Sequence, residues 1–276
     1  MKFKIVSDSS ADLLKIAGVP FESVPLKIIT SEREYVDDGS LDVLGMLGDL
    51  KGYKGKSRTS CPNSEEYLAA FGDAENVFCI TITGGLSGSF NAASIAAKTY
   101  IEQHPERHIH VIDSLSTGAE NALIIEKLSS LIAELDDFDL VKERITEYHD
   151  HTRLIFALES MHNLANNGRV SPIVAKVCGV LGIRVIGRAS DVGTLEITNK
   201  SRGMKSAVSD IVKNMGAEGF DCGRVKLHHA NNLAFAEAVR EKLLAEHPAA
   251  SVEIAEARGL CSFYAEAGGL LVGFEV

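Results

Sequence analysis

The chain has 276 residues, of which 45% are hydrophobic and 24% charged, so its composition excludes a disordered protein. The 28 Lys and Arg residues against 38 Asp and Glu residues give a formal net charge of −10. That balance, with no Trp in the chain, argues against a nucleic-acid surface, which needs a basic stripe to neutralise phosphates. Small anions are still possible ligands, because a few local donors are enough to bind them.

The start of the chain and its cysteines favour a cytoplasmic location. The apolar run at residues 3–6 is too short for the core of a secretory signal. The apolar stretch 177–187 is interrupted by Arg184 and is too short to cross a bilayer. The cysteines are odd in number and lie far apart without a CxxC pair, which is typical of a reducing compartment. They are Cys61, Cys79, Cys178, Cys222 and Cys261.

Short β-rich runs alternate with helical stretches in the first half of the chain. This alternation predicts a parallel sheet with helices on its faces. The nearly all-apolar run 77–82 predicts a strand that is buried on both faces. The expected strands are 3–6, 24–29, 77–83 and 108–113, and the expected helices are 91–102, 123–135 and 140–149.

The pattern changes near residue 150. The second half predicts a helix at 161–166 among strands at 154–158, 183–186, 195–198, 223–228, 252–255 and 270–275. We therefore expect an α/β protein of two domains. Residues 1–150 would form the parallel-sheet domain and residues 151–276 a mixed α+β domain.

The segment 83–89, directly after the strand at 77–82, is a candidate anion site. Thr83 and Gly84 open it, and Ser87, Gly88 and Ser89 lead into the next helix. Glycines allow a ligand to come close to the backbone, where free N–H groups and the positive end of the helix dipole face it. The alternative is structural: the glycines make a tight turn and a serine caps the helix.

A second candidate is the segment 58–66. Pro62 suits a first helical position, with Ser60 or Cys61 as the cap, and capping accounts for most of the segment. Thr59 and Ser60 nevertheless add neutral hydroxyl donors that can reach a carboxylate without a formal positive charge.

Catalytic alternatives have less support. Ser87 lies between a strand and a helix, as the nucleophile of a hydrolase would, but residues 85–89 lack the last glycine of G-x-S-x-G. Nothing in the sequence brings Asp113, His228 or His229 to Ser87. No metal-ligand spacing or dinucleotide-binding fingerprint occurs, so we expect neither a metal nor a cofactor.

Two arginines could serve an anionic ligand or a partner protein. Arg169 follows Gly168, which suits the C′ position of the preceding helix. Arg169 either caps the exposed carbonyls of that helix or offers its planar fork to a phosphate or carboxylate. Arg202 belongs to the basic cluster 200–205, which is either a solvated turn or a binding patch.

Six segments together resemble the DegV family, in order and in approximate spacing: 6–13, 59–62, 83–89, 111–114, 158–171 and 200–203. The resemblance covers nearly the whole chain. It implies a two-domain DegV-like fold that buries a long-chain fatty acid in a tunnel between the domains. It also implies a lipid-binding protein rather than an enzyme, which presents the acyl carboxylate to a separate ATP-dependent fatty acid kinase for conversion to acyl phosphate.

The resemblance further implies roles for individual residues. Thr59 or Ser60, with Ser87 and the backbone at Gly88, would hold the carboxylate. Arg169 and Arg202 would face the partner or the phosphate. We expect the head-group site to lack a close cation, because a carboxylate held by neutral donors stays nucleophilic.

The chain departs from the family pattern near its end. A histidine that contacts the carboxylate in the family is absent from residues 258–269. Tyr264 or Ser262 would replace this donor, or it is lost. Glu266 would repel an ionised carboxylate unless it faces away or is protonated.

Three other interpretations stay open at this point. The chain could bind another apolar carboxylate or lipid, it could be a Ser87-dependent acyl hydrolase, or it could have a purely regulatory interaction role. A regulatory protein of that kind would have no ligand and no tunnel.

Overall fold

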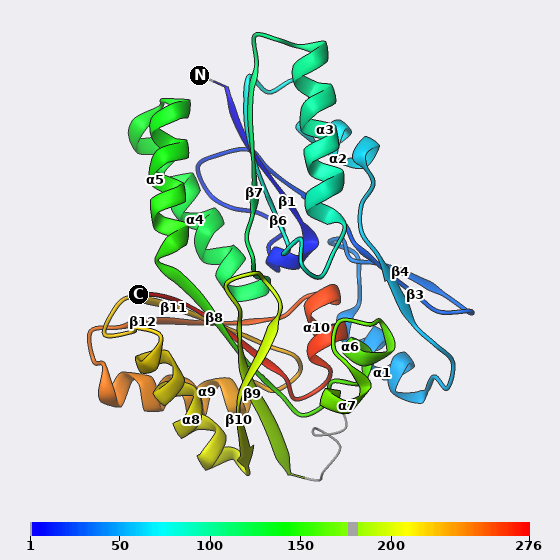
Figure 1. Cartoon of the computed structure of the whole chain (residues 1–276), viewed down its shortest axis with the longest axis vertical. Helices are drawn as coiled ribbons and strands as arrows, with labels where there is room; N and C mark the ends of the chain where they lie inside the picture. Colours follow the sequence, from blue (N-terminus) through cyan, green and yellow to red (C-terminus); the bar gives the residue numbers. More distant parts are fainter. Residues whose placement is uncertain (1, 176–181) are drawn as a thin grey trace.

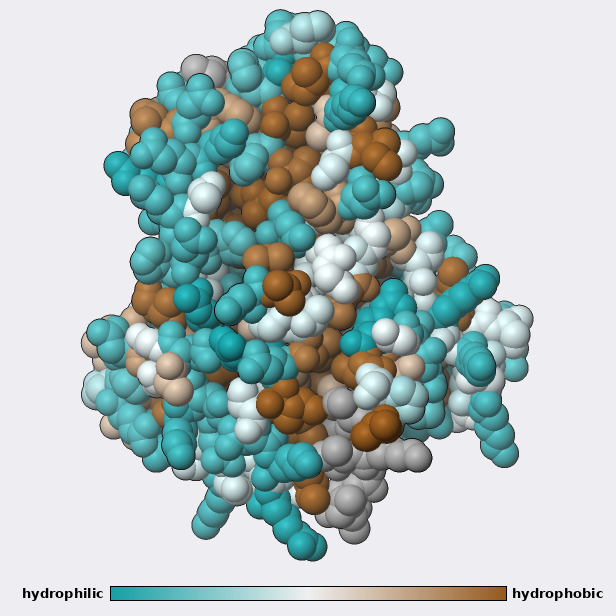
Figure 2. Space-filling model, viewed as in Figure 1, coloured by the Kyte–Doolittle hydropathy of each residue, from teal (hydrophilic) through white to brown (hydrophobic). Residues whose placement is uncertain are grey.

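The computed structural model describes residues 2–175 and 182–276, which form three β-sheets with helices on their faces (Figure 1). Cys178 and the first part of the apolar stretch 177–187 lie outside the described residues. In the described part, the four remaining cysteines are free thiols, and no helix combines the length and apolar character that a membrane crossing requires. Hydrophilic side chains cover most of the face shown in Figure 2, which accords with the high charge of the chain.

The first sheet is parallel throughout, as the alternating pattern predicts, with strand order β2-β1-β6-β7. Helices lie on both of its faces (Figure 1). Phe78 and Ile80 pack beneath α4 and α5, while Val77 and Cys79 pack beneath α2 and α3. The strands are β1 (Phe3–Asp8), β2 (Phe21–Val24), β6 (Asn76–Thr81) and β7 (His108–Asp113), and the helices are α2 (Ser64–Phe71), α3 (Ser89–Gln103), α4 (Gly118–Leu135) and α5 (Phe138–Asp150).

The second sheet is mixed, with strand order β10-β9-β8-β13-β11-β12. Among the described strands of this second sheet, β11 and β12 pair in parallel and all the other pairings are antiparallel. One face is covered by α8 (Met204–Ala217) and α9 (Leu233–Glu246), and the other face turns toward the first sheet and α4 (Figure 1). The strands are β8 (Thr152–Leu158), β9 (Ile183–Ala189), β10 (Leu195–Arg202), β11 (Arg224–His229), β12 (Ser251–Glu256) and β13 (Leu270–Glu275).

The third sheet is small and antiparallel, in the order β4-β3-β5, and all its strands come from residues 27–60. It packs against α1 (Val43–Gly52) and against α10 (Gly259–Ala265), which lies just before the last strand. The division into two domains at residue 150 remains a prediction. Helix α10 belongs to the second half of the sequence but packs against the small sheet and α1 of the first half. Its strands are β3 (Lys27–Ile29), β4 (Glu34–Val36) and β5 (Arg58–Ser60), and the other short elements are η1 (Ser9–Ala11), α6 (His162–Asn166) and α7 (Pro172–Ala175).

Two local predictions were wrong. The predicted strand 24–29 is divided at Pro25, since proline cannot donate to a ladder, and its parts β2 and β3 belong to different sheets. Neither Ser60 nor Cys61 caps α2. Asn63 does so in a capping box with Glu66, which places the start of the helix beyond Pro62.

Candidate functional site

A largely apolar pocket lies between the loops at the carboxyl ends of β6 and β7 and the facing side of the second sheet. The space between its lining atoms, including the open mouth, is about 820 Å³. An elongated apolar molecule is the kind of ligand that such a lining accepts. The apolar lining consists of Leu26, Ile82, Leu86, Leu115, Leu154, Phe156, Leu158, Leu164, Ala189, Leu195, Leu260, Ala265 and Leu271.

Strand β8 supplies the deep wall of the pocket. Leu154, Phe156 and Leu158 are two residues apart, so their side chains leave the same face of the sheet. Gly187 lies opposite Phe156 on β9, and a Cβ there would be 2.3 Å from the phenyl ring. The glycine therefore makes room for the ring.

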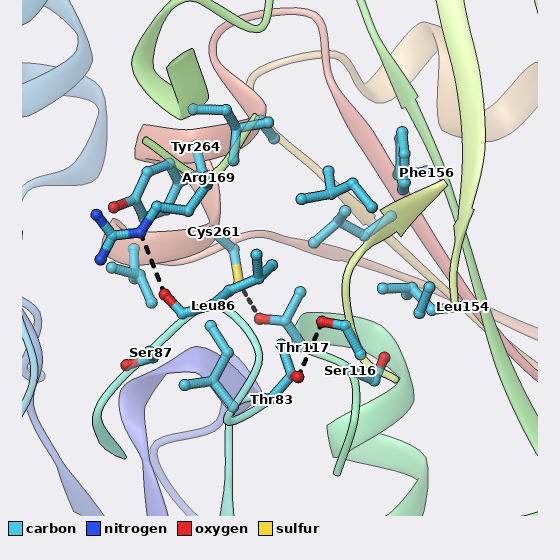
Figure 3. Close-up of a pocket in the computed structure, with 18 of the residues that line it drawn as sticks. Thr83, Leu86, Ser87, Ser116, Thr117, Leu154, Phe156, Arg169, Cys261 and Tyr264 are labelled. Atoms are coloured by element: carbon cyan, nitrogen blue, oxygen red, sulfur yellow. Dashed lines mark hydrogen bonds between the residues drawn. The ribbon is translucent and has the colours of Figure 1, made fainter. Parts of the chain in front are cut away.

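Polar groups gather at the other end of the pocket, and we call Thr59, Ser87, Arg169 and Tyr264 the polar end. Figure 3 shows Ser87, Arg169 and Tyr264 on one side and Leu154 and Phe156 on the other. The hydroxyls of Thr59 and Tyr264 are 2.6 Å apart. Burial raises the pKa of Tyr264 above its ordinary value, so this phenol keeps its proton at neutral pH.

Strand β5 and helix α3 place two of these hydroxyls. On β5, Thr59 is half-buried between the exposed Arg58 and Ser60, so it alone of the three turns to the pocket. Ser87 immediately precedes Gly88, the N-cap of α3, which has no side chain to cap the helix. The positive end of the helix dipole is therefore close to the Ser87 hydroxyl.

The sequence predicts a head-group site without a close cation, but the structure places a cation, Arg169, at the polar end. Arg169 lines the same pocket as Thr59 and Ser87, and its charge acts on Tyr264 by lowering the pKa against the larger effect of burial. Its Nε donates to Leu86 O at 3.1 Å, and a second guanidinium nitrogen donates to Asn167 O. Gly168 occupies the C′ position of α6, as predicted. The direction in which the chain turns back after this residue places Arg169 at the pocket, and that direction could not be predicted from the sequence.

Thr83 and Gly84 are held by protein partners. Thr83 lines the pocket, but its hydroxyl donates to Gly193 O at 2.9 Å and accepts from Gly85 N at 3.1 Å. Gly84 lies outside the lining and donates its N–H to Asp113 Oδ1 at 2.9 Å. Thr83 thus ties the loop after β6 to the turn between β9 and β10.

Other predicted residues lie outside the pocket lining. Ser60 is exposed, and the buried Ser262 donates to Ala257 O at 2.7 Å. Arg202 is exposed at the opposite end of β10 from Leu195, which does line the pocket. Glu266 is absent from the lining, and its carboxylate accepts from Asn163 N at 3.1 Å at the start of α6.

Two buried aspartates that the sequence analysis missed anchor α10, which carries Tyr264. Asp37 accepts from Gly259 N and Leu260 N at 2.9 Å each. Asp12 accepts from Arg258 N at 2.8 Å and lies 2.9 Å from His228 Nδ1 in the second sheet. Asp12 belongs to the 6–13 segment, but spacing along the chain gives no signal for these long-range contacts.

The geometry gives no support to a hydrolase or a metal site. Within the described residues, the hydrogen bonds of Ser87 Oγ reach Ser89, and none reaches a histidine. His228 contacts Asp12 instead. The described part of the chain holds no cluster of three His, Cys, Asp or Glu side chains placed to bind a metal ion.

Comparison with known proteins gives matches over the full length. A family model described as "Uncharacterised protein, DegV family" matches residues 2–275. A DegV domain-containing protein of Streptococcus pneumoniae is 41% identical over 280 residues, with both chains fully covered.

Solved structures are also similar. The Streptococcus pneumoniae Fatty Acid Kinase (Fak) B3 protein, loaded with linoleic acid, is 41% identical and has a TM-score of 0.98, with 100% of each chain covered. A DegV family protein from Eubacterium eligens, loaded with heptadecanoic acid, is 40% identical and has a TM-score of 0.97, with 99% of each chain covered.

Proposed function

Since the chain belongs to the DegV family, we propose that it binds a long-chain fatty acid in this pocket, with the carboxylate at the polar end. The observation that carries the proposal is the division of the pocket. Two hydroxyls, a phenol and a guanidinium gather at one end of a lining that is otherwise largely apolar. The fatty acids in the two similar solved structures support the same ligand class.

Burial of the acyl chain supplies the affinity. Each buried methylene contributes about 0.8 kcal/mol, so ~15 methylenes contribute roughly 12 kcal/mol before ordering costs are deducted. The hydroxyls of Thr59 and Ser87 then orient the head group. Tyr264 supplies the donor that the family's histidine would give, since Ser262 is committed to Ala257.

The bound acid would be presented to an ATP-dependent fatty acid kinase. A carboxylate oxygen attacks the γ-phosphorus of ATP, the bond to the ADP oxygen breaks, and ADP leaves with the electron pair. The chain contributes binding and orientation, and the kinase contributes the catalytic groups. The relationship to the Fatty Acid Kinase (Fak) B3 protein supports this partner.

Arg169 has a role in phosphoryl transfer rather than in docking alone. Its guanidinium lies at the polar end, where negative charge accumulates as the phosphoryl group arrives. Arg202 is exposed and lies at the end of β10 that is farther from the pocket, so we assign it to the surface that meets the kinase.

The alternative is another apolar carboxylate or lipid in the same pocket. A Ser87-dependent acyl hydrolase is less favoured, because the hydrogen bonds of Ser87 lead to Ser89 rather than to a base. Reaction of Ser87 with a fluorophosphonate probe would favour the hydrolase.

Mass spectrometry of organic extracts from the protein purified from a bacterial host tests the proposal. We expect a stoichiometric fatty acid that is lost or strongly depleted in the Thr59→Val, Ser87→Ala double variant. A different lipid in the wild-type extract would contradict the ligand class, and an undiminished fatty acid in the variant would contradict the head-group site.

A further inference from the structure

A buried carboxylate lies beneath the loop that carries Ser87. Asp8 ends β1 and is fully buried, and we call residues 83–88 the head-group loop. The backbone N–H of Ile82, immediately before this loop, donates to Asp8 Oδ2 at 2.9 Å. The other oxygen of Asp8 accepts from the backbone and the hydroxyl of Ser10.

The far end of the head-group loop meets the same carboxylate through Ser89. Ser89 is the first residue of α3, and its side chain is buried. Burial raises the pKa of Asp8, and hydrogen bonds from Ser10, Ile82 and the Ser89 side chain oppose that rise. Asp8 therefore interacts with the residues on both sides of the head-group loop.

Ser89 connects this carboxylate to the ligand side of the loop. The hydroxyl oxygens of Ser87 and Ser89 are 3.2 Å apart, and Ser89 N donates to Ser87 Oγ at 3.3 Å. The single hydroxyl proton of Ser87 is donated to Ser89 Oγ, and it can turn to a ligand carboxylate while Ser89 N still holds the Ser87 oxygen in place. Because Ser89 contacts both Asp8 and Ser87, the position of the Ser87 side chain depends on the contacts of Asp8 with Ile82 and Ser89.

The geometry points to Asp8 as the positioning residue of the head-group site, which fixes the loop at Ile82 and Ser89 so that Ser87 can donate to the ligand carboxylate. This inference rests on the proposed function. Asp8 does not contact the ligand pocket itself, since it is absent from the lining. Replacement of Asp8 should therefore change recognition of the head group and leave the apolar part of the pocket intact.

A pair of ligands that differ only in the head group separates positioning from general stability. We would measure the Kd of linoleic acid and of linoleyl alcohol by displacement of a fluorescent fatty acid at pH ~8, where free carboxyls are ionised. Wild-type protein should prefer the acid by about tenfold or more, since hydrogen bonds to a charged group are strong. Ser87→Ala should remove most of that preference.

Asp8→Asn should reduce the preference for the acid at least ~3-fold while the Kd of the alcohol stays within about twofold. The double variant with Ser87→Ala should show no further loss, because both changes act on the same contact. Glu120→Gln is the matched control. Glu120 is also a buried carboxylate, which accepts from Thr152 at 2.7 Å, and it does not border the head-group loop.

Ser89→Ala is a second variant that decides the question if Asp8→Asn does not fold, and it should reduce the preference in the same way. If wild-type protein showed no preference for the acid, both the head-group site and this inference would be wrong. If Ser87→Ala lost the preference while Asp8→Asn and Ser89→Ala kept it, only this inference would be overturned.

Discussion

Thr59 and Tyr264 lie 205 residues apart in the chain, yet their hydroxyl oxygens are 2.6 Å from each other at the polar end of the pocket. One hydroxyl comes from the small sheet near the start of the chain and the other from α10 near its end. The polar end therefore forms only when these two segments are packed together.

Tyr264→Phe should weaken fatty acid binding by about fivefold, because one hydrogen bond contributes about 1 kcal/mol. Titration calorimetry checks the change. The hydroxyl of Tyr53 bonds to Ser31 outside the pocket, so Tyr53→Phe should leave the affinity unchanged. Equal effects of the two substitutions would argue against a role for Tyr264.

The raised pKa of Tyr264 also predicts how this contact responds to pH. The phenol keeps its proton at least up to its ordinary value of 10.0, so it donates equally well across the neutral range. The difference in affinity between wild-type protein and Tyr264→Phe should be constant from pH ~6 to ~9. A histidine donor would titrate in that interval.

Thr83→Val should destabilise the protein by about 2 kcal/mol, because it leaves Gly193 O and Gly85 N without their partner. Gly85→Ala should act at the same contact, since a Cβ there would lie 2.9 Å from Val192 O. Urea unfolding measures both free energies. Gly48→Ala is the control, because no atom lies within 4 Å of the added Cβ. An equal free energy of unfolding for Thr83→Val and wild-type protein would show that this contact is unimportant.

The raised pKa of Asp37 predicts that the free energy of unfolding depends on pH. Burial raises its pKa from 3.8 to about 6, so the folded protein binds a proton that the unfolded chain has already released between these values. Its contribution to folding is fully present below pH ~4 and is lost as pH rises through ~6, by about 3 kcal/mol at most.

The measurement is the free energy of unfolding of wild-type protein and Asp37→Asn from pH ~4 to ~7. Wild-type protein should lose stability relative to the variant as the pH rises. Asp8 and Glu120, whose pKa values burial also raises, titrate in both proteins and cancel in the difference. A constant difference would contradict the raised pKa.

Arg169→Ala should keep fatty acid binding within a few-fold and lower phosphorylation by a fatty acid kinase by more than ~10-fold. Arg202→Ala should instead weaken association with the kinase and leave the affinity for fatty acid unchanged. Binding and single-turnover assays on both variants separate the two roles. Normal binding together with full turnover in Arg169→Ala would contradict the assignment.

The large elements could be predicted from the sequence because their patterns are local. Strands β7 and β13 occupy the predicted residues, and the buried strand before the head-group loop follows from its apolar run. The strands β3, β4 and β5 have three residues each, which is too short for a period, so the small sheet was not predicted.

The site could be predicted only in part. Thr59, Ser87 and Tyr264 were predicted as ligand-binding residues, and they lie together in the pocket. The position of Arg169 at the polar end depends on how the chain turns back after α6, and the engagement of Thr83 depends on a turn 110 residues away. Such contacts are tertiary and leave no periodic signal in the sequence.

A crystal structure of the protein with linoleic acid tests the central claim most directly. We predict the carboxylate within hydrogen-bonding distance of Thr59 Oγ1 and Ser87 Oγ, with the acyl chain running past Cys261 toward Leu154 and Phe156. A carboxylate at the Phe156 end, or a fatty acid bound outside this pocket, would contradict the account.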